Sequence, residues 1–146
     1  MANDFSGDGN CKALWSFESG AFTDDSKGGN DLTDNNTVTT AVISAPPPGD
    51  GTQCANPEQG STEFFDIDDS ALDAGFPLKN GDSNKKISVC FWFNMESDTA
   101  NTRYMFAKYN TDTGTRSFAV VVVASSDLLA MNIGYNNGGR DRKSVV

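Results

Sequence analysis

The sequence predicts an all-β protein built as an antiparallel β-sandwich or β-barrel. Short runs of β-branched and aromatic residues alternate with clusters of Gly, Asn, Asp and Ser, as strands and turns do in such folds. No stretch has the periodicity of an amphipathic helix. The chain has 146 residues, a common size for one domain, so a single hydrophobic core is expected.

The strands are expected where the apolar runs occur. Their ranges are 12–18, 37–43, 62–67, 86–94, 103–109, 116–124 and 127–135. Short turns at 110–115 and 124–127, the first with Gly114 available for a positive φ, predict a three-stranded meander over 103–135. By contrast, 44–61 carries four of the five prolines and is predicted to be a long surface excursion.

Alternation along each strand predicts which side chains face the core. The expected inner residues are Ala13, Trp15 and Phe17; Phe65 and Ile67; Ile87, Val89, Phe91 and Phe93; and Leu129, Met131, Ile133 and Tyr135. The opposite, mixed face of 86–94 carries Ser88, Cys90, Trp92 and Asn94, and Phe64, Asp66 and Asp68 point outward from 62–67.

The charge excludes several function classes. The formal net charge is −9, so nucleic acid is not expected as a partner, because phosphate binding depends on Lys and Arg. Histidine is absent, which removes the imidazole base of most hydrolases and the usual zinc ligands. No apolar stretch approaches the ~20 residues of a membrane span, and no apolar signal region follows "MANDFSGDGN", so either a cytosolic chain or a mature form without its signal is expected.

The three cysteines have different surroundings in the sequence. Cys90 lies in an apolar run and is expected to be a small buried hydrophobe. Cys11 and Cys54 lie in polar surroundings at strand edges, and a bridge between them would be the natural oxidised pairing, although spacing alone leaves this open.

Several segments, in this order, resemble a laminin-G-like domain of the concanavalin A-like jelly-roll superfamily. They are "ALWSFESG", "DDSKGGNDL", "EFFDIDDSALDAG", "KKISVCFWFNMES", "RYMFAKYN" and "SFAVVVVASSDLLAMNIG". The match spans residues 11–137, with 1–10 as an N-terminal arm and 138–146 as a C-terminal tail. The resemblance implies a jelly-roll sandwich.

The chain departs from that family after "GYNNGGRDRKSVV", where a "Trp-His-Val-Ala" strand and a "Leu-Tyr-Val-Asn-Gly" hairpin would be expected. The sandwich is therefore predicted to be incomplete on its C-terminal side. An incomplete sandwich would expose the row of Phe91 and Phe93, so a second copy or another chain is expected to cover it.

The loop "FTDDSKGGNDLTDNN" is the first candidate site. Asp24, Asp25, Asn30 and Asp31 offer the oxygen ligands that Ca²⁺ prefers, and related domains often hold calcium in rim loops. A well-solvated turn without metal remains the alternative.

The second candidate is a sugar site. Carbohydrate sites combine an aromatic platform with polar side chains that bond hydroxyl groups. Trp92 and Asn94, with Tyr104 and Tyr109 on the next strand and Asp66 and Asp68 on the outer face, are the expected ligand-binding residues. The alternative is that a loop covers Trp92.

The third candidate, a glycosidase, fails on strand parity. Glucanases of this superfamily carry their carboxylates on one face of a strand, spaced as Glu-x-Asp-x-x-Glu. Here Glu63 lies on the face opposite Asp66 and Asp68, and no glutamate follows at the required position. No enzyme activity is expected.

The sequence thus favours a secreted or particle-surface module that binds a glycan or a surface protein, with Ca²⁺ as its candidate cofactor. A structural or assembly protein, whose open sandwich pairs with a neighbouring chain or a second copy, is the alternative.

Overall fold

The computed structural model describes residues 5–18, 22–44, 51–79, 83, 86–95, 101–108, 118–124, 126, 128–134 and 140–144. The chain forms two compact units, Met1–Ile87 and Ser88–Val146. The described residues form small antiparallel sheets and one 3₁₀ turn, η1 (Gln59–Ser61), with no α-helix among them. The expected all-β antiparallel class is confirmed at that level. Nor does any helix among these residues have the length and apolarity that a membrane span requires.

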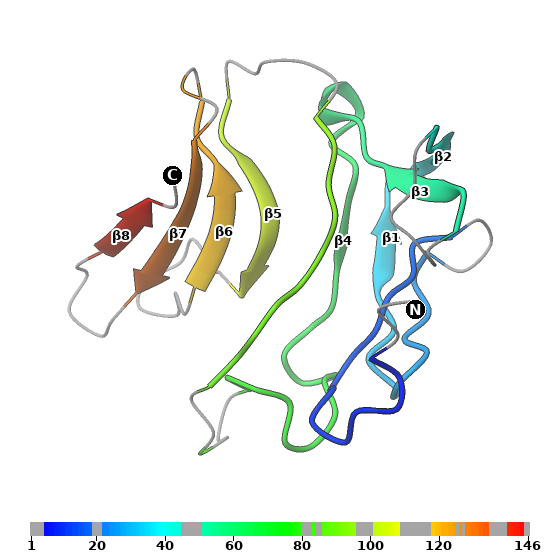
Figure 1. Cartoon of the computed structure of the whole chain (residues 1–146), viewed down its shortest axis with the longest axis vertical. Helices are drawn as coiled ribbons and strands as arrows, with labels where there is room; N and C mark the ends of the chain where they lie inside the picture. Colours follow the sequence, from blue (N-terminus) through cyan, green and yellow to red (C-terminus); the bar gives the residue numbers. More distant parts are fainter. Residues whose placement is uncertain are drawn as a thin grey trace. The chain divides into compact units, whose positions relative to one another are not determined.

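The first unit contains two short ribbons (Figure 1). Strand β1 (Thr33–Asn35) pairs with β4 (Phe64–Asp66), and β2 (Thr39–Val42) pairs with β3 (Gln53–Asn56), both antiparallel. Strands were predicted at the positions of β2 and β4, whereas β1 and β3 lie in segments expected to be loops.

Strand β3 corrects the prediction that all of 44–61 is a surface excursion. Proline cannot donate a ladder hydrogen bond, but Gln53–Asn56 lies in the proline-free part of that stretch, directly before Pro57. This part of the segment can therefore pair with β2, with Ala41 opposite Cys54.

Alternation along β4 follows the prediction. Phe65 is half-buried, whereas Phe64 is 48% exposed and Asp66 is exposed. The Phe65 ring stacks on Phe17 at a centroid distance of 5.4 Å and contacts Phe22 at 6.2 Å. These three rings form the aromatic cluster of the first unit.

The strand predicted over 12–18 does not form. Only an isolated bridge joins Trp15 to Asp25, and Phe17 has a φ of 55°, which an extended strand does not tolerate. The backbone here bonds to the following loop instead, since Ser26 N donates to Leu14 O at 3.0 Å.

The second unit is a four-stranded antiparallel sheet, drawn side by side in Figure 1. Its strands are β5 (Arg103–Lys108), β6 (Phe118–Val122), β7 (Leu129–Gly134) and β8 (Arg140–Ser144), in that order. The predicted three-stranded meander is confirmed. Part of the expected C-terminal tail is in fact a strand, because Arg140–Ser144 pairs with β7. The wider domain boundaries stay a prediction.

The main buried cluster of this sheet lies on a different row from the one predicted, although Phe118 and Val122, which stand opposite Ile133 and Leu129, are also buried. Ala119 and Val121 on β6 and Ala130 on β7 are 0%, 1% and 1% exposed and form one cluster. Register explains this, because Ala130 stands opposite Val121 and so shares its face. The predicted inner row is wrong at Ile133, which is 38% exposed, while Leu129 and Met131 are half-buried and Tyr135 lies outside the described residues.

Candidate functional site

The Asp-rich loop is organised around a buried carboxylate. Asp25 is 7% exposed, and its Oδ1 accepts hydrogen bonds from the amides of Leu14 (2.8 Å) and Lys27 (2.9 Å). Its Oδ2 accepts from the Asn30 amide at 3.3 Å and from Asn30 Nδ2 at 2.9 Å. A carboxylate has about four lone-pair positions, so the hydrogen-bonding capacity of Asp25 is filled by N–H donors.

Asn30 joins this loop to two other segments. It is 0% exposed, and its Nδ2 donates to Lys12 O at 3.1 Å and to Asp73 Oδ2 at 3.2 Å as well as to Asp25. Its Oδ1 accepts from Asp73 N at 2.8 Å, and its backbone carbonyl accepts from Trp15 Nε1 at 2.9 Å. Every polar atom of this buried amide is thus paired, as the cost of an unpaired buried group requires.

Asp73 belongs to this network although sequence reasoning did not select it. Its Oδ2 also accepts from Gly29 N at 3.2 Å. It lies 43 residues after Asn30, in "SALDAGF", where no spacing or motif links it to the loop. Only the fold brings the two together.

The network controls the ionisation of Asp25. Burial raises the pKa of this carboxyl, but hydrogen bonds from the Leu14 amide, the Asn30 side chain and the Lys27 and Asn30 amides outweigh burial. The pKa of Asp25 therefore lies below its ordinary value of 3.8, and the group is ionised at neutral pH.

The residues present do not fit a calcium ion built on Asp25 and Asn30. Calcium takes six to eight oxygen ligands, whereas Asp25 already accepts four N–H bonds and Asn30 directs its Nδ2 into the loop. Asp31 accepts from Asp25 N at 2.9 Å, and the exposed Asp24 accepts from Thr23 Oγ1 at 3.4 Å. Among the described residues no group of three or more His, Cys, Asp or Glu is placed to hold a metal. Calcium bound through Asp25 and Asn30 is therefore not expected, and only a calcium ion held by other residues of this loop stays a prediction.

The second candidate site is the segment formed by residues 87–95, here called the aromatic segment. It was predicted to be a strand with its apolar row facing the core, yet no strand forms there. Val89, Phe91 and Phe93 are 36%, 36% and 47% exposed, and the Phe91 and Phe93 rings contact each other at 5.9 Å. Alternation predicts two faces but not a partner for either, which is why the inward assignment is wrong here.

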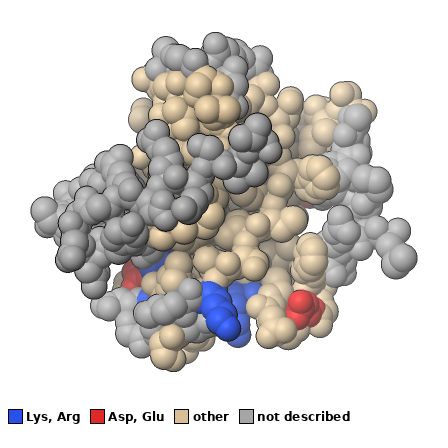
Figure 2. Space-filling view, turned by 60° about the vertical axis from the view of Figure 1, so that its left-hand side comes forward, with Lys and Arg blue, Asp and Glu red and all other residues tan. Residues whose placement is uncertain are grey.

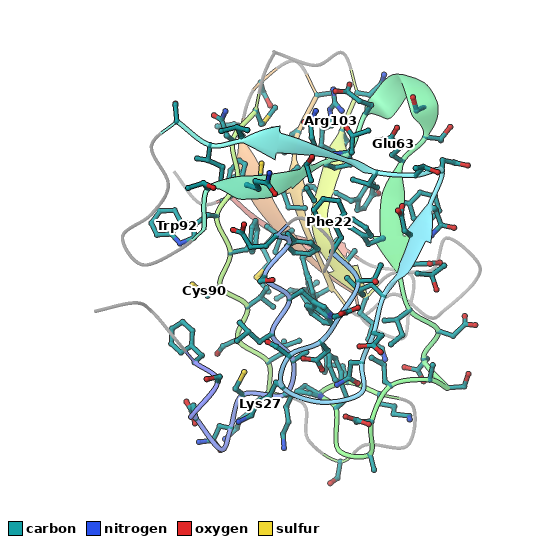
Figure 3. The ribbon with its side chains drawn as sticks, turned by 90° about the vertical axis from the view of Figure 1, so that its right-hand side faces the viewer. Phe22, Lys27, Glu63, Cys90, Trp92 and Arg103 are labelled. Atoms are coloured by element: carbon teal, nitrogen blue, oxygen red, sulfur yellow. The ribbon has the colours of Figure 1, made fainter. Side chains whose placement is uncertain are left out.

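Trp92 is the most exposed residue of this segment. It is 69% exposed, and Figure 3 shows its indole pointing away from its own ribbon. The covering loop of the alternative interpretation is therefore not found among the described residues, and Trp92 is available as an aromatic surface. Asn94, at the same parity, is also exposed.

The remaining predicted ligand residues are divided between the two units. Tyr104 on β5 is 55% exposed, Asp66 and Asp68 are exposed in the first unit, and Tyr109 lies outside the described residues. Asp66 Oδ1 accepts from Asn35 Nδ2 at 2.8 Å across the β1–β4 ribbon. Its carboxylate thus has a structural contact.

The cysteines differ from expectation. All three are free thiols, so the Cys11–Cys54 bridge is not formed, and Cys11 Sγ donates instead to Ala13 O at 3.4 Å. Cys90 is exposed rather than buried, because the segment that carries it is not covered as predicted.

Two further features of the structure lacked a sequence signal. Arg103 Nε, at the start of β5, is buried without a hydrogen-bond partner. On the face drawn in Figure 2, most described side chains are uncharged and the charged ones lie along the lower edge. The described Asp and Glu side chains therefore form no patch on that face.

Comparisons with models of protein families, with curated proteins and with solved structures found no match. The resemblance to laminin-G-like domains therefore rests on the order and identity of the segments quoted above.

Proposed function

We propose that this chain is a non-enzymatic binding module of a cell or particle surface, similar to laminin-G-like domains, whose sheets belong to a jelly-roll sandwich. It recognises a glycan or a surface protein through the aromatic segment. The observation that carries this proposal is the exposure of Phe91, Trp92 and Phe93 on consecutive positions. Exposed apolar groups gathered in this way mark interaction surfaces, whereas single exposed residues do not.

A glycan is the favoured small ligand because of Trp92 and Asn94. The indole, 69% exposed, offers a flat surface for the apolar face of a pyranose ring. Asn94 is exposed at the same parity and can both donate to and accept from sugar hydroxyl groups. Tyr104, in the same unit, is a further exposed aromatic ring.

A glycan array tests this proposal. Binding to a defined set of sugars is expected, and Trp92→Ala should lose it because the stacking surface is removed. Phe64→Ala is the matched control, since Phe64 is also a half-exposed aromatic residue but lies on β4 in the other unit. If no sugar on the array is bound, or if Trp92→Ala binds as well as the native chain, the proposal that this chain binds a glycan through Trp92 is wrong.

A structural or assembly role is the second candidate. It is favoured by the strand-like sequence of 87–95 combined with its unpaired state, because such a segment offers a template for another strand. In that case the array stays silent and the aromatic segment acts only between protein chains.

A further inference from the structure

We propose that residues 87–95 pair as an antiparallel strand with the same residues of a second copy of this chain, centred on Phe91. This inference rests on the proposed role of the aromatic segment as the contact surface, and it names the partner.

The backbone of this segment is free to pair. Within the part of the chain that the structure describes, residues 87–95 belong to no strand and make no hydrogen bond. Yet their sequence, "ISVCFWFNM", has the β-branched and aromatic composition and the alternation of a strand. A run of unpaired N–H and C=O groups on such a segment is a template for an added strand.

The sequence of the segment complements itself. In an antiparallel pair centred on Phe91, Phe91 stands opposite its own copy and Val89 stands opposite Phe93. At the ends of the same row, Ile87 stands opposite Met95. Every apolar residue of the row thus meets another apolar residue, and aromatic and β-branched cross-strand pairs stabilise sheets.

The flanking charges in the sequence support the same register. Lys86, which also has a contact within its own chain, precedes the row, and Glu96, which lies outside the described residues, follows it. By sequence position, the register centred on Phe91 pairs the lysine of one copy with the glutamate of the other, at both ends. This arrangement has two-fold symmetry, in which each contact occurs twice, as in the commonest class of homodimer.

The net charge sets a condition for this pairing. Each copy carries −9, so two copies repel each other at long range. Raising the salt concentration from about 0.15 M to about 1 M shortens the screening length from about 8 Å to about 3 Å. The dimer should therefore become tighter with added salt, whereas a complex with a basic partner would become weaker.

Sedimentation velocity over a concentration series tests the proposal on the full chain. The native protein is expected to show a monomer–dimer equilibrium. Phe91→Lys should abolish the dimer, because two lysines would face each other at the symmetry axis. The control is Ser88→Lys, which adds the same charge at an exposed position of the opposite face and should retain the dimer. Circular dichroism checks that both variants remain folded.

A charge swap fixes the partner and the register. Lys86→Glu alone should raise the dissociation constant of the dimer roughly tenfold, because like charges then stand opposite at two places. The double variant Lys86→Glu/Glu96→Lys should restore it, since the ends are complementary again. Restoration supports pairing with a second copy. Failure to restore, or a native chain that is monomeric at every concentration, would overturn it.

Failure of this inference differs from failure of the proposed function. A monomer that still binds sugars through Trp92 refutes self-pairing and leaves the binding module intact. A dimer that is silent on the glycan array retains self-pairing and removes the glycan as ligand.

Discussion

Replacing Gly28 by alanine should destabilise the protein, because the loop packs its buried polar network against this Cα. A Cβ at Gly28 would lie 2.7 Å from Asp73 Oδ2 and 3.1 Å from both Asn30 Nδ2 and Asp25 Oδ2. The first separation is too short for a Cβ contact, so the Asp73 carboxylate has to move. The other two require the buried network itself to shift by a few tenths of an ångström.

The loss in the free energy of unfolding can be estimated from the hydrogen bonds that the displaced Asp73 and Asn30 side chains make. If Asp73 swings into solvent, it loses its bonds from Gly29 N and Asn30 Nδ2, both 3.2 Å long, at about 1 kcal/mol in total. That figure is modest because Asn30 Nδ2 keeps two other acceptors. Displacing Asn30, which is 0% exposed, adds about 1 kcal/mol. The stiffer unfolded chain of the alanine variant offsets about 0.4–1 kcal/mol. The net loss is about 1 kcal/mol, or roughly 4 °C in Tm.

Urea denaturation followed by circular dichroism measures this loss, with Gly29→Ala as the matched control. A Cβ at Gly29 would meet its nearest atom, Asp73 Oδ1, at 3.6 Å, which is an ordinary contact, and the N–H that bonds Asp73 is kept. In an Asp73→Ala background the cost of Gly28→Ala should shrink, because the closest clash is gone. Equal effects of the two glycine variants would refute the reasoning.

Three further predictions concern the Asp25 carboxylate, a bound metal and the backbone at Thr37. Because the pKa of Asp25 is held below 3.8, its stabilising contribution is present above about pH 4 and is lost as the pH falls through the lowered pKa. In Asp25→Asn, the free energy of unfolding measured in urea should therefore change less between about pH 4 and pH 2 than in the native chain. The control variant Asp24→Asn, at an exposed carboxylate, should keep the native pH dependence. Excess chelator should leave Tm unchanged, because N–H donors already occupy the hydrogen-bonding positions of the Asp25 carboxylate. A chelator-induced drop in Tm of several degrees that is absent in the Asp31→Ala variant would instead favour a bound calcium ion. Thr37 has a φ of 64°, so Thr37→Gly should raise the free energy of unfolding by about 1 kcal/mol, while Thr39→Gly in β2 should lower it; losses in both would contradict this.

The sheet of the second unit was largely predictable because its signals are local. β-Branched residues in β6, a short turn and a second apolar run before Gly134 are all encoded within a few positions, and the meander they predict is observed. The buried row was not predictable in the same way. Whether Ala130 or Ile133 faces the core depends on what covers each face, and alternation is satisfied by either choice.

The Asp-rich loop shows a second limit. The residue types that suggest a calcium site, closely spaced carboxylates and amides, are equally good acceptors for backbone N–H groups. Which role Asp25 takes depends on donors elsewhere in the chain, here Leu14, and on how Asn30 meets Asp73 at a separation of 43 residues. A local pattern cannot contain that information, so the loop could be selected from the sequence while its chemistry could not.

The aromatic segment combines both limits. The alternation of apolar and polar residues predicts that this segment is a strand. It does not predict that the strand packs in the core of its own chain, because the pattern carries no information about the neighbouring strand. Val89, Phe91 and Phe93 are partly exposed on a backbone that bonds to nothing described. A strand-like segment in that state either binds a partner or promotes aggregation. In an antiparallel register centred on Phe91, every residue of the apolar row stands opposite another apolar residue, and Lys86 and Glu96 flank the row. Pairing with a second copy would therefore give the backbone hydrogen-bond partners, cover the apolar row and place opposite charges at both ends.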